Sequence, residues 1–315
     1  MKRAFVFPGQ GSQAVGMGKA LAETFPHARA VFDEVDAALS QKLSALMWEG
    51  PAEELTLTAN AQPALMAVSL AVIRVLEAEA GLDLGRHAAF VAGHSLGEYS
   101  ALAAVRSLSL SDTARLLRIR GNAMQNAVPV GEGAMAALLG LDFDDALAIA
   151  TEAAQGDVCD VANDNGGAQV VVSGHKAAVE RAVALAPAKG AKRAVMLSVS
   201  APFHCLLMAP AAEAMREALA TAILNPPVVP VVANVEARAI TAPEAIRNAL
   251  VRQVTATVRW RESVAYMAAE GVQSFYEAGA GKVLTGLVKR IAAGATGASI
   301  GGPEDVAAFK ASLGG

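Results

Sequence analysis

Residues 90–100 read FVAGHSLGEYS, a short apolar run that leads into a serine with a glycine two places to either side. A helix-forming segment, residues 99–104, follows at once. Glycine at positions 93 and 97 permits a sharp strand-to-helix turn, because Cβ atoms there would crowd the apex. Such a turn exposes the hydroxyl group of Ser95, and the helix start directs free N–H groups toward an anion formed beside it. The stretch therefore predicts a nucleophile elbow in an α/β fold.

The composition of the 315-residue chain narrows its class. Apolar residues make up 54% and mean hydropathy is +0.38. Much of this is alanine, and no stretch looks long enough without charged or turn residues to span a bilayer. Lys2 and Arg3 precede only a short apolar run, unlike the core of a signal peptide. We therefore expect a cytoplasmic protein that has no membrane partner.

Charge and cysteine content exclude further classes. The net charge is −4 and no long basic run occurs, which argues against nucleic acid as a partner. Cys159 and Cys205 form neither a metal-ligand spacing nor a disulfide framework. The sequence therefore indicates no metal site and a reducing compartment.

The first glycine-rich loop is a second candidate for function. It spans residues 8–13, PGQGSQ, directly after the apolar run of residues 4–7. It lacks the Lys-Ser/Thr and the glycine spacing of phosphate-binding loops. Loops at the carboxyl ends of strands bind ligands in open α/β sheets. Gln10 and Gln13 therefore belong either to a plain turn or to a binding loop.

Three arginines lie on a helix expected over residues 114–124, which residues 111–113 are expected to cap. Arg115 and Arg118 share a face and are expected to be solvated. Arg120 points elsewhere. If it faces inward, its guanidinium needs an anionic partner.

His204 is the strongest candidate base for Ser95. It occupies a loop just before a predicted helix, from which it can reach across a cleft, although packing against the neighbouring prolines is the alternative. His94 adjoins the serine, but neighbours across a tight turn point apart. The remaining histidines fall in predicted surface turns or early helix positions; they are His27, His87 and His175.

Residues 129–198 are predicted to form an inserted subdomain. Strands are expected at 134–140, 158–163, 168–174 and 194–199, with helices at 142–154 and 177–186. This β-α-β-β-α-β order is the split βαβ unit of ferredoxin-like domains. Residues 1–128 and 199–315 then form a hydrolase-like α/β body with a parallel sheet. Within the body, residues 62–76 should be a buried central helix with Pro63 in its first turn, and the Gly/Ala-rich tail should be peripheral.

Several motifs in order resemble those of malonyl-CoA:acyl carrier protein transacylases, a family that loads malonate for bacterial fatty acid synthesis. The resemblance covers almost the whole chain. It rests on residues 7–13 (FPGQGSQ), 93–101 (GHSLGEYSA), 120–121 with 124–125 (RG, MQ), 202–205 (PFHC), 250–253 (LVRQ) and 277–286 (EAGAGKVLTG). The family's plan, a hydrolase-like body with an inserted ferredoxin-like subdomain, is the plan expected above.

The resemblance implies roles for five residues. Ser95 is similar to the nucleophile and His204 to the general base and acid. A main-chain carbonyl, here that of Gln253, orients the histidine where hydrolases use a carboxylate. The backbone N–H groups of Gln10 and Leu96 are similar to the oxyanion hole.

The resemblance also implies how the acyl group is recognised. Arg120 is similar to the arginine that binds the malonyl carboxylate. Leu96 and Phe203 are similar to acyl-pocket residues that crowd an α-methyl branch, so malonyl should be preferred over methylmalonyl by roughly 1–3 kcal/mol. Asn165 is near the cleft in relatives. Residues 163–168, NDNGGA, lack the expected serine-proline pair, so its contact with the pantetheine or phosphate arm stays open.

The implied reaction is a ping-pong transfer through malonyl-serine, from malonyl-CoA to the phosphopantetheine arm of acyl carrier protein. No bound cofactor is implied, and we expect a monomer with a transient, acidic carrier as partner. The carrier would meet a basic rim. Its candidates, each equally well explained as ordinary solvated surface, are Lys189, Lys192, Arg193, Lys289 and Arg290.

Three alternatives remain open. A serine esterase or thioesterase could use the same elbow with water as acceptor. The carrier could belong to polyketide synthesis. A carrier-binding scaffold would form no covalent adduct at Ser95.

Overall fold

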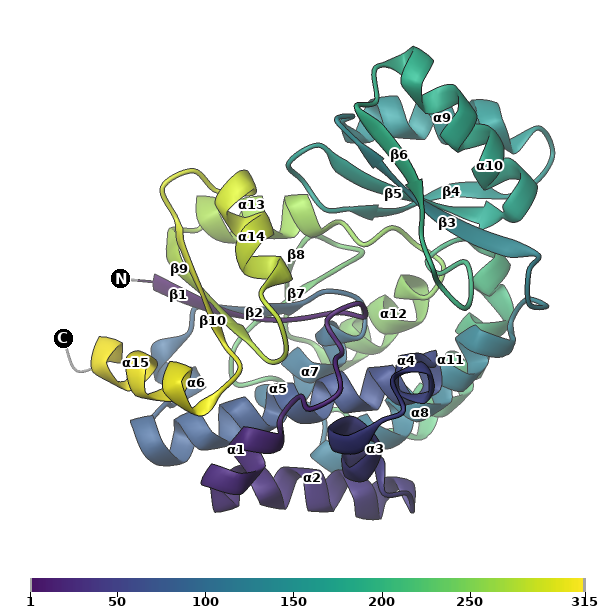
Figure 1. The fold of residues 1–315 in the computed structure, drawn as a ribbon. Helices are drawn as coiled ribbons and strands as arrows, with labels where there is room; N and C mark the ends of the chain where they lie inside the picture. Colours follow the sequence, from purple (N-terminus) through teal and green to yellow (C-terminus); the bar gives the residue numbers. More distant parts are fainter. Residues whose placement is uncertain (1, 314–315) are drawn as a thin grey trace.

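A six-stranded sheet forms the body of the protein, which a computed structural model describes over residues 2–313 (Figure 1). The strand order is β10-β9-β1-β2-β7-β8, and all neighbours are parallel except the antiparallel pair β7–β8. The strands are β1 (Lys2–Phe7), β2 (Phe90–Gly93), β7 (Val231–Ala233), β8 (Arg238–Ile240), β9 (Val272–Ala278) and β10 (Thr296–Ile300). The carboxyl ends of β1, β2 and β7 lie side by side, which is where ligands bind in open α/β sheets.

Helices cover both faces of this sheet because the central strands are apolar on both sides. Phe5 and Phe7 of β1 pack into the larger core, and the intervening Val6 packs into a second core on the other face. Helices α13 and α14 cover this second face (Figure 1). The body helices are α1 (Lys19–Thr24), α2 (Pro26–Leu39), α3 (Leu43–Glu49), α4 (Ala52–Thr56), α5 (Thr58–Ala80), α6 (Leu84–His87), α7 (Gly97–Ala104), α8 (Leu110–Asn126), α11 (Ala209–Thr221), α12 (Pro243–Gln253), α13 (Trp260–Ala269), α14 (Val283–Ile291) and α15 (Pro303–Leu313).

A separate four-stranded antiparallel sheet forms a small subdomain, seen apart from the body at the upper right of Figure 1. Its order β4-β5-β3-β6 places the third strand between the first and the second, as in a ferredoxin-like unit. The elements are β3 (Gly133–Leu139), α9 (Phe143–Ala154), β4 (Cys159–Asp164), β5 (Gln169–His175), α10 (Lys176–Leu185) and β6 (Arg193–Met196). The predicted fold class, a parallel-sheet body with a ferredoxin-like insert, is confirmed.

The subdomain is tied to the body by main-chain hydrogen bonds along β4. The Asp164 N–H group donates to the Val258 carbonyl at 3.0 Å, and the Val258 N–H group donates to the Ala162 carbonyl at 2.9 Å. Arg261 adds an ion pair to Asp164 at 2.8 Å. These contacts hold the subdomain over the carboxyl edge of the body sheet.

Helix α5 is the central helix of the body, and it is longer than predicted. It begins at Thr58 rather than near residue 62, so Pro63 lies inside the helix and not in its first turn. By length and composition α5 could cross a membrane, with mean hydropathy 1.4, but 89% of that stretch is buried within the fold. The predicted start was wrong because proline is common in the first turn of a helix but is not confined to it.

Helix α8 also differs from its prediction. It begins at Leu110, and the Ser109 hydroxyl caps it by accepting a hydrogen bond from the Asp112 N–H group at 3.0 Å. Arg115 is exposed, as predicted. Arg118 is only partly exposed, and it donates to Asn60 Oδ1 and Gln41 Oε1 at 2.8 and 2.6 Å, so the prediction of a freely solvated side chain holds only in part. Spacing alone could not show these distant acceptors.

The carboxyl-terminal segment is part of the body, contrary to prediction. Strand β10 extends the sheet beside β9, and α15 packs against α5. Phe309 is 3% exposed and its ring meets the Tyr276 ring edge-to-face at 4.9 Å. The Gly/Ala-rich composition concealed this because only Val306 and Phe309 of α15 are buried.

Candidate active site

Ser95 occupies the turn between β2 and α7. Its φ of 54° is in the left-handed region, which non-glycine residues rarely adopt. The flanking glycines are sterically required: a Cβ atom at Gly93 would lie 1.9 Å from the Gly97 backbone, and one at Gly97 would lie 2.3 Å from the Phe7 carbonyl oxygen. The tight turn predicted from the glycine spacing is thus a property of the backbone packing.

Two buried amide side chains hold the turn. The Ser95 N–H group donates to Asn234 Oδ1 at 2.8 Å, and the Ser95 carbonyl accepts from Gln253 Nε2 at 3.0 Å. Asn234 also donates from Nδ2 to the Gly93 carbonyl at 2.7 Å. Sequence reasoning missed Asn234, although its place directly after β7 was a signal, because β7 neighbours β2 in the sheet.

His204 lies against the serine. Its Nε2 is 2.7 Å from Ser95 Oγ, and its Nδ1 is 2.9 Å from the Gln253 main-chain carbonyl. A carbonyl oxygen can only accept, so Nδ1 carries the proton and Nε2 is free to accept from the serine hydroxyl. His204 is itself left-handed, with φ 57°.

Burial lowers the pKa of His204 to about 3, and the positive charge of Arg120 adds to the effect. The hydrogen bond to the Gln253 carbonyl opposes it. The imidazole is therefore neutral at neutral pH, which is the form that can take a proton from Ser95.

Arg120 faces inward, which was one of the two orientations that the sequence left open. Its side chain is 1% exposed, donates to Gln62 Oε1 and Gln253 Oε1 at 2.8 Å each, and lies 3.1 Å from Ser95 Oγ. The guanidinium also lies 5.7 Å from the centre of the Tyr99 ring. Burial lowers its pKa, but a guanidinium stays protonated in proteins. A buried positive charge therefore stands beside the serine.

These groups open into a cavity of about 310 Å³. Gln10 and Leu96 line it, and in the described part of the chain neither of their backbone N–H groups donates to another protein group. Both donors are thus available near Ser95. Phe203, which is 8% exposed, also lines the cavity.

Asn165 lies beside this cavity rather than in its lining. Its Oδ1 is 2.9 Å from His94 Nε2, and the His94 ring lies 5.7 Å from the Trp260 ring centre. Burial lowers the pKa of His94, and the hydrogen bond that its Nε2 donates to Asn165 Oδ1 opposes this effect. His94 thus points toward the subdomain, and a contact of Asn165 with substrate stays a prediction.

The five basic residues considered for the rim are all exposed. Lys189 pairs with Glu152 at 2.9 Å. Arg290 packs over the Gly167 turn that follows Asn165, since a Cβ atom at Gly167 would lie 2.7 Å from its Cδ. The five residues form two groups, Lys189, Lys192 and Arg193 in one and Lys289 and Arg290 in the other. Arg290, in the second group, lies beside the turn that contains Asn165.

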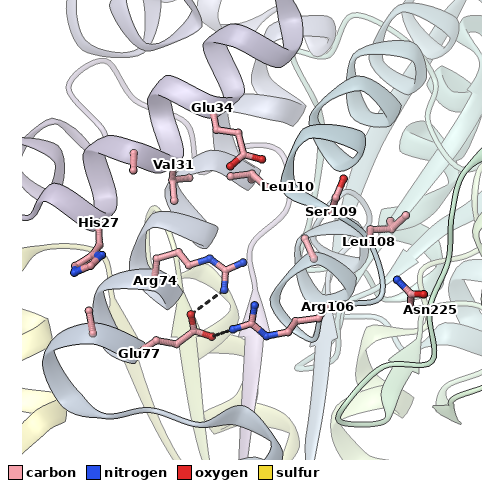
Figure 2. A pocket seen from close by; sticks show the side chains of 13 residues that line it. His27, Val31, Glu34, Arg74, Glu77, Arg106, Leu108, Ser109, Leu110 and Asn225 are labelled. Carbon is pink, nitrogen blue, oxygen red and sulfur yellow. Dashed lines mark hydrogen bonds and ion pairs between the residues drawn. The ribbon is translucent and has the colours of Figure 1, made fainter.

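A larger hollow of about 770 Å³ lies on the body between α2, α5 and the segment that joins α7 to α8 (Figure 2). Its two arginines, Arg74 and Arg106, both pair with Glu77, at 2.8 and 3.1 Å. Its lining residues show no serine–histidine hydrogen bond like that of Ser95. The Ser95–His204 pair, and not the size of the cavity, therefore identifies the candidate active site.

The chain belongs to the acyl transferase domain family, whose model matches residues 4–300. The assignment as an acyltransferase is thereby confirmed. The chain is 50% identical over 305 residues to the malonyl CoA-acyl carrier protein transacylase of Escherichia coli (strain K12), covering 97% of each chain.

Solved structures agree. The acyl-carrier-protein-S-malonyltransferase of Bartonella henselae shares 58% identity and a TM-score of 0.97 over 100% of both chains. A malonyl-transacylase in complex with its type II PKS acyl-carrier protein shares 42% identity and a TM-score of 0.95, covering 99% of this chain and 100% of that one. The resemblance to malonyl-CoA:acyl carrier protein transacylases is confirmed.

Proposed function

We propose that the protein transfers a malonyl group from malonyl-CoA to the phosphopantetheine thiol of an acyl carrier protein, through a malonyl ester of Ser95. The observation that carries the proposal is Arg120: a buried cation 3.1 Å from the serine hydroxyl, facing the same cavity. A hydrolase for neutral esters has no use for a buried guanidinium, whereas a malonyl group brings a carboxylate to meet it.

In the first half-reaction Ser95 Oγ attacks the thioester carbonyl while His204 Nε2 takes its proton. The carbonyl oxygen becomes an anion, to which the backbone N–H groups of Gln10 and Leu96 can donate. The Gln253 carbonyl holds the imidazolium by its Nδ1 proton. The C–S bond then breaks, His204 returns the proton to the sulfur, and CoA leaves.

In the second half-reaction the carrier's thiol enters the same cavity. His204 takes its proton, the sulfur attacks the ester of Ser95, and the proton returns to Ser95 Oγ as the malonyl thioester forms. The two substrates use one site in turn, which gives ping-pong kinetics. The groups named here suffice for this chemistry, so the proposal includes no resident cofactor or metal.

The relatives' names and the carrier complex support an acyl carrier protein as partner. We propose a carrier of fatty acid synthesis, received at the basic residues beside the Asn165 turn. The protein is proposed to act in the cytoplasm as a monomer. Substrate preference for malonyl over methylmalonyl is proposed to come from Leu96 and Phe203, which line the acyl cavity.

The test is an intact-mass measurement. Incubation with malonyl-CoA should add one malonyl group to the wild-type protein and none to Ser95→Ala, and holo-carrier should remove it with malonyl-carrier appearing in equal amount. The experiment is run in two arms, one with a carrier of fatty acid synthesis and one with a carrier of polyketide synthesis. Continuous CoA release beyond one equivalent per protein, without any carrier, would indicate hydrolysis, and no adduct at all would leave only a binding role; either result overturns the proposal.

A further inference from the structure

Glu98 is a buried carboxylate beside the nucleophile to which the mechanism above gives no part. It lies in the first turn of α7 and is 1% exposed. Its Oε2 accepts hydrogen bonds from the Asn234 backbone N–H group and from Gln253 Nε2, both at 2.9 Å. Carboxylates are rarely buried so deeply without a specific partner.

The side-chain amide of Gln253 is held between two charged groups of opposite kind. On one side the carboxylate of Glu98 accepts from Nε2, and on the other Arg120 donates to Oε1 at 2.8 Å. An ionised carboxylate can only accept and a guanidinium can only donate. The amide therefore has one satisfactory orientation, since a flipped amide would set donor against donor and acceptor against acceptor.

The same glutamine touches both halves of the reacting site. Its main-chain carbonyl receives the Nδ1 proton of His204 at 2.9 Å, and its Nε2 also donates to the Ser95 carbonyl at 3.0 Å. A shift of this one residue therefore moves the base, the nucleophile's backbone and the arginine's acceptor together.

We propose that Glu98 is a positioning residue of the transfer reaction: its carboxylate fixes the Gln253 amide and, through it, the geometry of His204 and Arg120. This inference rests on the proposed function. The negative charge of Glu98 also favours the charged form of Arg120, since it raises the pKa of Arg120 against the effect of burial. The ionised form of Glu98 is the active one, because its bond to Gln253 is then charge-assisted.

Protonation of Glu98 should be visible in the pH profile. Burial raises the pKa of Glu98 to about 7, against the hydrogen bonds from Asn234 and Gln253 and the charge of Arg120. The other titratable groups around the amide do not change charge there. His204 has a pKa of about 3, burial raises the pKa of Tyr99 further above its usual range, and Arg120 stays charged. As pH falls through about 7, Glu98 gains a proton and the rate should fall.

The experiment measures kcat/KM for malonylation of Ser95 from about pH 5.5 to pH 8.5 in wild type, Glu98→Gln and a control, a range that brackets this pKa. The wild type should show one acid limb. Glu98→Gln keeps an acceptor oxygen but has no charge, so it should be about 10- to 100-fold slower above the limb and lack the limb itself. Any protonation of malonyl-CoA itself affects the rates of all three proteins equally, so it does not alter the comparison between them.

The matched control is Glu277→Gln. Glu277 is equally buried and accepts from the Leu284 and Thr285 N–H groups at 3.1 and 2.7 Å, at the start of α14. Losing its charge should lower thermal stability but keep the acid limb, as any purely structural carboxylate would.

The inference is overturned if Glu98→Gln keeps the acid limb at the wild-type pH, or if its rate equals that of wild type. Either result leaves the proposed function intact, because the malonyl adduct on Ser95 still forms. Failure of the proposed function is distinct, since then wild type forms no adduct. Should Glu98→Gln not fold, the wild-type profile decides, because a profile without an acid limb near neutrality also overturns the inference. Glu98→Asp, which retains the charge, should keep a limb.

Discussion

Arg120→Met tests the central claim that a buried guanidinium recognises the acyl carboxylate. Methionine keeps an unbranched apolar stem like that of the arginine and removes the fork of donors. In wild type this fork is 1% exposed and bonds Gln62, Gln253 and Ser95. The change should slow transfer of malonyl far more than transfer of acetyl, which has no carboxylate.

The magnitude follows from the bonds that malonyl would lose. A bidentate arginine–carboxylate contact contains two charge-assisted hydrogen bonds, each worth about 1.5–3 kcal/mol. The malonyl-specific loss is therefore about 3–6 kcal/mol, or roughly 10²- to 10⁴-fold in rate. The variant also leaves the side-chain amide oxygens of Gln62 and Gln253 without their donor. This lowers the rate for both substrates alike, so it cancels in the ratio of the two kcat/KM values.

The assay follows CoA release in the first half-reaction with malonyl-CoA and acetyl-CoA in parallel, and compares kcat/KM ratios between wild type and variant. Intact mass confirms the ester on Ser95. An equal loss for both substrates would refute the reasoning, since Arg120 would then act only on the shape of the site.

Three other changes test separate features. Phe203→Ala should raise the kcat/KM of methylmalonyl-CoA relative to malonyl-CoA by about 10- to 200-fold, because the ring no longer crowds the branch, and an unchanged ratio would place specificity elsewhere. Gly93→Ala should abolish Ser95 malonylation because its Cβ atom would lie 1.9 Å from the Gly97 backbone, whereas Gly286→Ala, with nothing within 4 Å, should raise thermal stability slightly. Phe309→Ala should lower the free energy of unfolding by about 3–5 kcal/mol in denaturant titration; a loss below about 1 kcal/mol would show that α15 is peripheral after all.

The parts of the site that the sequence predicted are those where local chemistry determines geometry. Gly93 and Gly97 predicted the turn at Ser95 because glycine at both places is a steric requirement of a sharp strand-to-helix connection. The order of strands and helices likewise predicted the ferredoxin-like insert. For Arg120 the residues left two readings open, and only the family resemblance favoured the inward one.

The parts that it missed depend on contacts between distant segments. Asn234 lies 139 residues from Ser95 along the chain, and its place at the end of a strand becomes informative only when that strand is known to neighbour β2. Gln62 and Gln253 reach Arg120 across 58 and 133 residues. The end of the chain was underestimated for the same reason, because Phe309 is buried against segments distant in sequence and contacts the rings of Phe5 and Tyr276.

The two residues proposed to exchange a proton share an unusual backbone. Ser95 and His204 both have left-handed φ angles, 54° and 57°, and both carry a Cβ atom there. Such residues cost about 1–2 kcal/mol each relative to a relaxed conformation, and glycine would adopt either with less strain. The backbone conformation thus favours glycine at both positions, whereas the proposed reaction needs a hydroxyl group at one and an imidazole at the other. At Ser95, where glycine removes only a small side chain, selection for thermal stability alone would favour glycine and would yield a more stable protein without a nucleophile.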